Sequence, residues 1–213
     1  MTGEPLDVQP RYVALAGTLA SMLIAGHAVR ERDRTVIAIA GESGSGKSTT
    51  ATALARELAT AGVRAVVLHQ DDYFMRPPRA NHAHRLADLS SVGPQEVDLD
   101  LLLAHIAAFR AGRDDVRAPR VDYPSDSFHT RRLDFANVAV LIIEGTYVLR
   151  LDDSDVRIFL DATHADTRAR RRARNRDIDD PAIDRILAIE HAIIAEQATA
   201  AQIVVDRDFN VRR

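Results

Sequence analysis

A short glycine-rich segment, Gly41–Ser48 (GESGSGKS), constrains the fold of this chain more than any other feature of its sequence. It fits the pattern G-x-x-x-x-G-K-[ST]. It stands between an apolar, largely β-branched run, Thr35–Ala40, and an alanine- and leucine-rich stretch, Ser48–Ala61. A strand that turns through such glycines directly into a helix is the setting in which this pattern binds phosphate. The sequence therefore predicts a phosphate-binding loop between a buried parallel strand and a helix.

The residue types of this segment suit phosphate chemistry. Glycines let the backbone curl so that successive N–H groups point at phosphate oxygens, and the start of the following helix adds a positive partial charge. We expect Lys47 to reach the β and γ phosphates and act in catalysis, and the Ser48 hydroxyl to hold Mg²⁺. The expected ATP-binding residues of the segment are Gly41, Glu42, Ser43, Gly44, Ser45, Gly46, Lys47, Ser48 and Thr49.

Lys47 is also the only lysine of the chain, because all the other residues among its 28 lysines and arginines are arginine. A compact ammonium group on a flexible stem fits inside a cradle of phosphate oxygens, where a planar guanidinium would be too large. The exception therefore favours a phosphate loop over a chance glycine-rich turn.

Short apolar runs alternate with helical stretches along the rest of the chain. The strand pattern recurs in four runs, of which the last is the shortest: Arg64–His69, Val138–Ile143, Val156–Leu160 and Ile203–Val205. Gly62 ends the helix at 48–61, and further helices begin at about His164 and Pro181. This alternation predicts an α/β fold, a P-loop NTPase three-layer α/β/α sandwich with a mainly parallel sheet, formed by residues 1–213 as a single domain.

Composition and the N-terminal stretch bear on location and partners. The formal net charge of -3 does not suggest nucleic acid as a partner, and the absence of cysteine fits the cytoplasm. The apolar stretch Val13–Gly26 could pass for the core of a signal peptide, but it is too short to span a membrane and follows Glu4 and Asp7. We therefore expect no membrane contact and an N-terminal helix at about residues 11–31, which buries Leu15, Leu19, Met22 and Ile24.

Acidic residues follow two of the predicted strands. Asp71 and Asp72 come after Arg64–His69, at the sheet edge where ligands of open α/β sheets bind. A carboxylate near the γ phosphate can orient and deprotonate an acceptor hydroxyl, so Asp71 is the expected catalytic base; a helix cap or solvated turn is the alternative. Glu144 ends the strand Val138–Ile143, where a hydrated Mg²⁺ beside the phosphate loop would be its partner, unless its role is purely structural.

The segment Gln70–Phe74 resembles the Gln-Asp-Ser-Phe-Tyr segment of the uridine kinase and phosphoribulokinase family, whose members carry a phosphate loop upstream of it. The resemblance implies a P-loop kinase domain in which Asp71 is the catalytic base and Asp72 takes the place of the serine. It also implies that Tyr73 belongs to the substrate-binding residues.

Three further segments resemble the family's acceptor motifs. Gly93–Leu101 is similar to its Pro-x-x-Phe-Asp stretch, which implies that Asp98 contacts ribose hydroxyls; a plain N-cap for the helix predicted at 99–111 is the alternative. Pro119–Tyr123 and Phe128–Arg131 resemble its Pro-x-Tyr-Asp-Phe and Thr-His-Ser-Arg pieces, which implies acceptor contacts from Tyr123, His129 and Arg131. Val121 stands where the family's base-contacting tyrosine is expected, so acceptors other than uridine stay open.

Six arginines fall within nine positions of the segment Asp166–Asp177, and such self-repulsion needs a counter-charge. The segment resembles the start of the family's mobile lid, expected here at about residues 164–181. The resemblance implies that Arg172 and Arg176 close over the ATP phosphates, with a catalytic role for Arg172. Some of the six must face solvent or nearby acids, and a nucleic-acid patch without interleaved aromatic residues is a weak alternative.

The resemblance implies an ATP- and Mg²⁺-dependent kinase that transfers the γ-phosphoryl group to a hydroxyl of a small metabolite, with a nucleoside such as uridine as the first acceptor. Other hydroxyl metabolites remain alternatives: pantothenate, glycerate, a sugar phosphate and nicotinamide riboside. A regulatory NTP-binding switch is an alternative of another class, which acceptor-independent hydrolysis would favour. The expected partner is the small hydroxyl acceptor, and a homo-oligomer is left open.

Overall fold

A six-stranded sheet forms the centre of the protein, whose computed structural model describes residues 9–29, 34–163, 166–167 and 182–212. Its strands lie in the order β2-β5-β1-β6-β7-β8, and all neighbouring pairs are parallel except β7 and β8. The strands are β1 (Thr35–Gly41), β2 (Ala65–His69), β5 (Val140–Gly145), β6 (Val156–Asp161), β7 (Ile203–Asp206) and β8 (Val211–Arg212). All four predicted strand runs are therefore present, and the sheet is mainly parallel.

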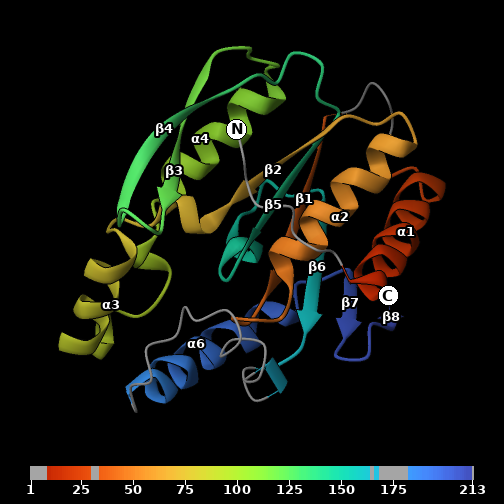
Figure 1. Cartoon of the computed structure of the whole chain (residues 1–213). Coiled ribbons are helices and arrows are strands. Elements are labelled where there is room, and N and C mark those ends of the chain that lie inside the picture. The colour runs from red at the N-terminus through yellow and green to blue at the C-terminus, as the bar shows by residue number, and fades with distance from the viewer. Residues whose placement is uncertain (1–8, 30–33, 164–165, 168–181, 213) are drawn as a thin grey trace.

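The two central strands, β1 and β5, are buried along their whole length, as their continuous apolar sequences predict. Alternate residues of β1 point to opposite faces of the sheet. Val36 and Ala38 join the core beneath α4 (Leu99–Arg110) and α6 (Ala182–Ala198). Ile37 and Ile39 join a second core beneath α1 (Pro10–Ala25) and α2 (Lys47–Thr60). The helices thus cover both faces of the sheet, and the three-layer α/β/α sandwich is confirmed (Figure 1).

The side of the sheet near β2 carries elements that the sequence did not predict in detail. β3 (Val116–Asp122) and β4 (Ser127–Leu133) form a separate antiparallel hairpin, between α4 and β5 in the chain. α3 (Pro78–Ala87) lies near this hairpin (Figure 1). The 3₁₀ turns η1 (Gln70–Tyr73), η2 (Leu89–Ser91) and η3 (Pro94–Glu96) lie between β2 and α4 in the chain, and η4 (Val148–Arg150) follows β5.

The N-terminal helix α1 is shorter than predicted, because it ends at Ala25 and not near residue 31. The chain leaves the helix at Gly26 and passes through His27, whose φ of 55° is incompatible with a continuing helix. Leu15 and Leu19 are buried as expected, but Leu23 takes the inner position and Ile24 is 37% exposed. Among the described residues, none of the helices has the length and apolarity that crossing a membrane requires.

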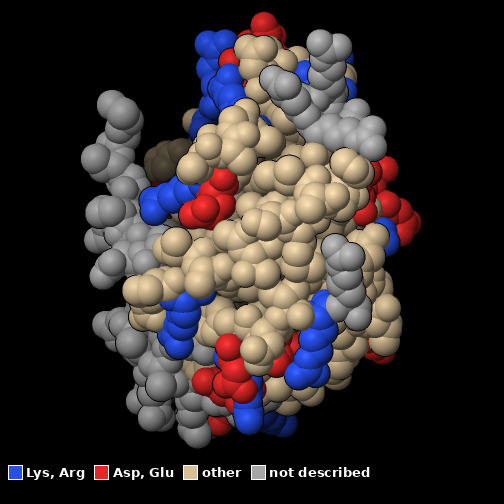
Figure 2. All heavy atoms as spheres, turned by 90° about the vertical axis from the view of Figure 1, so that its right-hand side faces the viewer, with Lys and Arg blue, Asp and Glu red and all other residues tan. Residues whose placement is uncertain are grey.

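The outer face of α1 has few charges, because no charged residue occurs between Tyr12 and Ala25. Figure 2 looks at this side of the molecule and shows a broad uncharged surface with acidic and basic groups mostly around it. Val13, 44% exposed, belongs to the outer face of the helix, and a shallow groove runs between α1 and α2.

Candidate active site

The phosphate-binding segment is a tight loop between β1 and α2, and its glycines are there because other side chains would not fit. Gly44 and Gly46 have φ values of 77° and 100°, in the left-handed region. A Cβ atom on Gly46 would also lie 2.5 Å from the Tyr12 hydroxyl of α1, and one on Gly41 would lie 2.7 Å from the Leu160 carbonyl oxygen of β6. The loop conformation is thus fixed by close packing against two neighbouring elements.

Lys47 and Ser48 begin α2, at the positive end of the helix. The Lys47 ammonium donates a hydrogen bond from Nζ to the carbonyl oxygen of Glu42, 2.9 Å away, so its side chain folds back over the loop. The Ser48 hydroxyl lies within hydrogen-bonding reach of Glu144 and favours the ionised form of that carboxylate. The loop therefore gathers an ammonium, a hydroxyl and a carboxylate in one place.

Glu144 is a buried carboxylate at the carboxyl end of β5, and His69 from the neighbouring end of β2 holds it. His69 Nδ1 lies 2.7 Å from Glu144 Oε1. Burial alone would raise the pKa of Glu144, but the bond to His69, the His69 and Lys47 charges and the Ser48 hydroxyl hold this pKa below its ordinary value. Burial alone would lower the pKa of His69. The hydrogen bond and the charge of Glu144 outweigh this effect, so the pKa of His69 is raised.

These residues fit a magnesium ion that is bound mainly through phosphate and water. The Ser48 hydroxyl and the Glu144 carboxylate are hard oxygen ligands next to the Lys47 side chain. The described residues contain no group of three or more His, Cys, Asp or Glu that could hold a metal by themselves. Mg²⁺ beside nucleotide phosphates needs only one or two protein ligands.

Asp71 and Asp72 are neighbours in η1 but lie in opposite environments. Asp71 is exposed, and its Oδ2 accepts a hydrogen bond of 2.8 Å from the Tyr123 hydroxyl at the end of the hairpin. Asp72 is 2% exposed and accepts a 2.9 Å hydrogen bond from the Val121 N–H, while Arg131 Nη2 lies 3.4 Å from its Oδ2. Burial raises the pKa of Asp72 despite these partners. Asp71 is thus free to meet a substrate, and Asp72 anchors the hairpin to η1.

Two of the expected acceptor residues, Asp98 and Tyr73, form hydrogen bonds within the protein itself. Asp98 is the N-cap of α4, where its side chain accepts from the Leu101 N–H at 2.9 Å. Tyr73 is 2% exposed in the core, with its hydroxyl 2.8 Å from His105 Nδ1. The structure therefore places the Tyr73 ring away from any surface that a substrate could reach.

The hairpin brings Tyr123, His129 and Arg131 to the same side of the molecule as Asp71. His129 is exposed and lies 3.4 Å from Asp122 across the two strands. The Arg131 side chain is largely buried beneath the hairpin, where it faces Asp72. Burial lowers the pKa of Arg131, and Asp72 opposes this effect.

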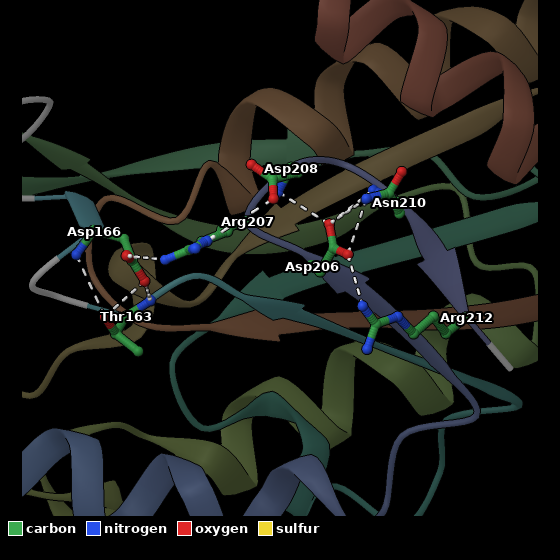
Figure 3. A network of polar contacts seen from close by, with 7 residues as sticks. All are labelled: Thr163, Asp166, Asp206, Arg207, Asp208, Asn210 and Arg212. Atoms are coloured by element: carbon green, nitrogen blue, oxygen red, sulfur yellow. Dashed lines mark hydrogen bonds and ion pairs between the residues drawn. The ribbon is translucent and has the colours of Figure 1, made fainter.

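Residues far along the chain brace the phosphate loop. The Thr167 hydroxyl donates to the Ser43 carbonyl oxygen at 2.9 Å, and His191 Nδ1 of α6 lies 2.6 Å from Glu42 Oε1. Next to the loop, a polar network joins Thr163 and Asp166 to the β7–β8 turn (Figure 3). In the other part of this network, Asp206 accepts hydrogen bonds from the backbone N–H groups of Asp208 and Asn210 and from the Arg212 guanidinium. The contacts Thr167–Ser43, His191–Glu42 and Arg207–Asp166 could not be predicted from the sequence, because each joins residues of distant segments.

A buried charge cluster was also missed in the sequence. Arg85 of α3 binds Glu96 through two hydrogen bonds, from Nε to Oε1 at 2.6 Å and from Nη2 to Oε2 at 2.8 Å. Its third nitrogen, Nη1, lies 3.1 Å from Glu190 Oε1 of α6. Asn81 Nδ2 also donates to Glu96. An arginine in a surface-like helix and two glutamates 94 positions apart give no sequence signal of such a cluster.

The lid arginines predicted to contact ATP, Arg172 and Arg176, lie outside the described residues.

The fold and the phosphate loop together define a P-loop nucleotide-binding protein of the α/β/α class. The phosphoribulokinase/uridine kinase family model matches residues 36–206. The chain belongs to this family, whose kinases use ATP with Mg²⁺.

Two curated relatives illustrate the range of the family. A bifunctional alpha-galactosidase/sucrose kinase of Mediterraneibacter gnavus is 31% identical over 193 residues, which cover 84% of this chain and 21% of that protein. The uridine kinase of Staphylococcus aureus is 34% identical over 142 residues, which cover 65% of this chain and 66% of that protein. The chain thus spans about a fifth of the first relative's length and just under two thirds of the second's.

Solved structures show the same fold. A candidate fructose transport system kinase from Silicibacter sp. TM1040 has a TM-score of 0.63 at 23% identity, covering 87% of this chain and 93% of that chain. Phosphoribulokinase from Rhodobacter spheroides has a TM-score of 0.60 at 14% identity, covering 82% and 70%. At these identities the likeness concerns the fold alone.

Proposed function

We propose that the protein is a kinase that transfers the γ-phosphoryl group of ATP to a hydroxyl group of a small polyhydroxylated metabolite. The observation that carries this proposal is the position of Asp71. Its exposed carboxylate is held by Tyr123 at the carboxyl edge of the sheet that also carries the phosphate loop. An exposed carboxylate in this place has a use in activating an acceptor and none in a simple nucleotide switch.

In the proposed mechanism, Asp71 accepts the proton of the acceptor hydroxyl while that oxygen attacks the γ phosphorus and the bond to the β-phosphate oxygen breaks. The loop N–H groups and Lys47 bind the phosphates and stabilise the charge that develops on them. Ser48 and Glu144 would hold Mg²⁺, which supplies charge neutralisation when bound. We assign Arg172 and Arg176 to the ATP phosphates, in line with the lid of the family.

A nucleoside such as uridine is one acceptor we consider, because of the similarity to uridine kinases. Asp98, Tyr123, His129 and Arg131 would then surround it, and the buried Tyr73 is left out of this set. A free sugar is the second candidate. The resemblance to the family gives a reason to favour it, because Val121 stands where the family's base-contacting tyrosine is expected.

We also infer a cytoplasmic location, which suits a cysteine-free chain that consumes ATP. The formal net charge of -3 does not suggest nucleic acid as a partner, and the predicted basic segment lacks the interleaved aromatic residues that single strands require.

ATP consumption with Mg²⁺ against a panel of nucleosides, sugars and other hydroxyl metabolites tests the proposal. We expect one acceptor class to raise turnover and Asp71→Asn to lower the acceptor-stimulated kcat by roughly 10²- to 10⁴-fold with nucleotide binding kept. Lys47→Ala should lose nucleotide affinity as well. Asp100→Asn, an exposed aspartate of α4, is the matched control.

If ATP binds but no acceptor raises its turnover, and Asp71→Asn leaves the slow hydrolysis unchanged, then Asp71 is not a base. The regulatory switch would then be the better assignment.

A further inference from the structure

Gln70 and Gly145 are each next to a functional carboxylate in the chain, and they lie against each other. Gln70 precedes Asp71 at the start of η1. Gly145 follows Glu144 at the end of β5. The β2–β5 ladder ends at the pair of His69 and Glu144, and Gln70 stands one step beyond this pair. A contact at this point therefore bears on the positions of both the proposed base and the carboxylate proposed to hold Mg²⁺.

The Gln70 side chain connects the two segments that leave β2 and β5. It is fully buried, and its Oε1 accepts a 2.7 Å hydrogen bond from the Tyr147 N–H. Tyr147 belongs to the segment between β5 and η4. Because β2 has already ended, this side-chain bond takes over from the backbone ladder in joining the two segments.

The contact between Gln70 and Gly145 is so close that only glycine fits at position 145. A Cβ atom there would lie 2.3 Å from Gln70 Cβ and 2.6 Å from Gln70 Oε1. Gln70 Cβ is bonded directly to the main chain, so rotation of the side chain could not relieve the first of these contacts. A larger residue at position 145 would therefore push the start of η1, and Asp71 with it, away from the end of β5.

The Gln70 amide nitrogen indicates that this side chain serves more than stability. Nε2 is buried and has no hydrogen-bond partner in the described part of the chain. An unpaired buried donor costs free energy, which an apolar side chain of the same length would avoid. Residues that break such a rule in natural proteins are concentrated at functional sites.

We propose that Gln70 is a positioning residue, which sets the separation between the base Asp71 and the Mg²⁺-binding carboxylate of Glu144. This inference rests on the proposed kinase function. In that reaction the acceptor hydroxyl must contact Asp71 and face the γ phosphate in the same complex, so a small change of this separation lowers transfer to the acceptor. Binding of ATP depends on the phosphate loop at the start of α2 and is left unchanged.

The test compares acceptor-stimulated turnover with ATP hydrolysis in the absence of acceptor. The ratio of these two rates does not depend on the fraction of folded protein, so a loss of stability alone leaves it constant. Gln70→Met keeps the length of the side chain and removes the amide oxygen. We expect the ratio to fall roughly 10- to 100-fold in this variant, with the Kd for ATP unchanged.

Leu58→Ala is the matched control for a loss of stability. Leu58 is fully buried in the last turn of α2, at the opposite end of that helix from the phosphate loop. Its truncation should destabilise the fold and leave the ratio unchanged. An unchanged ratio in Gln70→Met, or an equal fall in Leu58→Ala, overturns the inference and leaves the kinase function standing.

A double-mutant cycle tests the contact itself. Gly145→Ala should lower the ratio in the wild-type background, because the new Cβ displaces Gln70. In a Gln70→Gly background, which has no Cβ at position 70, Gly145→Ala should lower the ratio much less. Equal effects in the two backgrounds would contradict the inference. If Gly145→Ala does not fold, Gln70→Met and its control decide.

If no acceptor raises wild-type turnover, the kinase function itself fails. Crystal structures of wild type and Gln70→Met, each with Mg²⁺ and a non-hydrolysable ATP analogue, then decide the inference. A changed separation of the Asp71 and Glu144 carboxylates supports it, and an unchanged separation refutes it.

Discussion

At the scale of single residues, Asp71 and Asp72 show how adjacent identical side chains acquire different roles. The 3₁₀ turn at 70–73 directs one carboxylate outward to Tyr123 and the other inward to Val121 and Arg131. Their order along the chain predicts that they are at the strand end, but which one is buried depends on a hairpin almost 50 residues later.

Asp72→Asn should destabilise the protein by about 3 kcal/mol, because the largely buried Arg131 loses its counter-charge. The amide can still accept from the Val121 N–H, so the fold should be kept. Urea unfolding measures this difference, and Asp208→Asn, a 76% exposed aspartate, is the control. Equal stability of wild type and Asp72→Asn would show that the Arg131 contact contributes nothing.

Several residues of the candidate site could be named from the sequence because a local feature marks each of them. The phosphate loop with Lys47 and Ser48 needs only its own glycines and the following helix, and Glu144 needs only a strand end. The contacts His69–Glu144 and Arg85–Glu190 could not be predicted, because each joins residues that are far apart in the chain.

At the scale of elements, apolar runs predicted the strands of the large sheet because both faces of those strands are buried. The β3–β4 hairpin escaped prediction because its sequence, VRAPRVD and SFHTRRL, is mostly polar and partly exposed. Its position beside Asp71 is thus a result of tertiary packing and not of local pattern.

Helix α1 does more than cover the sheet, because it supports the phosphate loop. The Tyr12 ring packs on Gly46 and meets Phe209 edge to face, with ring centroids 5.0 Å apart. The loop is therefore held from behind by the N-terminal helix and by the C-terminal turn.

Tyr12→Ala should cost about 3–5 kcal/mol in stability and raise the Kd for ATP, because the Gly46 backbone loses its support. Leu19→Ala is the matched control, since Leu19 is fully buried on the same helix and belongs to the core on the sheet face. It should destabilise the fold to a similar degree with the Kd for ATP unchanged. Chemical unfolding and nucleotide titration at a temperature where both variants are folded measure the two effects. A similar rise of Kd in both variants would contradict a specific role for Tyr12.

At the scale of the whole molecule, α6 joins the two sides of the site through neighbouring residues. Glu190 reaches Arg85 of α3, and His191 reaches Glu42 of the phosphate loop. Consecutive residues of a helix point about 100° apart, so one helix can contact two different elements.

The buried Glu190 should also affect stability as a function of pH. Its pKa is raised in the folded state above the usual 4.5, so the folded protein holds this proton more tightly than the unfolded chain. The contribution of Glu190 to stability is therefore present below about pH 4.5 and is lost as pH rises through the folded-state pKa. The Glu190→Gln variant has no carboxyl group at this position, so its stability lacks this dependence on pH. The Tm of Glu190→Gln relative to wild type should increase by a few degrees between pH 4 and pH 7, measured by calorimetry. A constant difference across this range would contradict the raised pKa.

Because Lys47 is the only lysine of this sequence, the phosphate loop can be labelled selectively at its side-chain amine. No other side chain here carries a primary amine, and there is no thiol, so an amine-selective acylating reagent has only Lys47 to modify among the side chains. In the present conformation its ammonium rests on the Glu42 carbonyl oxygen, and bound phosphates would cover it. Occupancy of the nucleotide site can therefore be followed by mass spectrometry as protection of one side chain from acylation, without any engineered label.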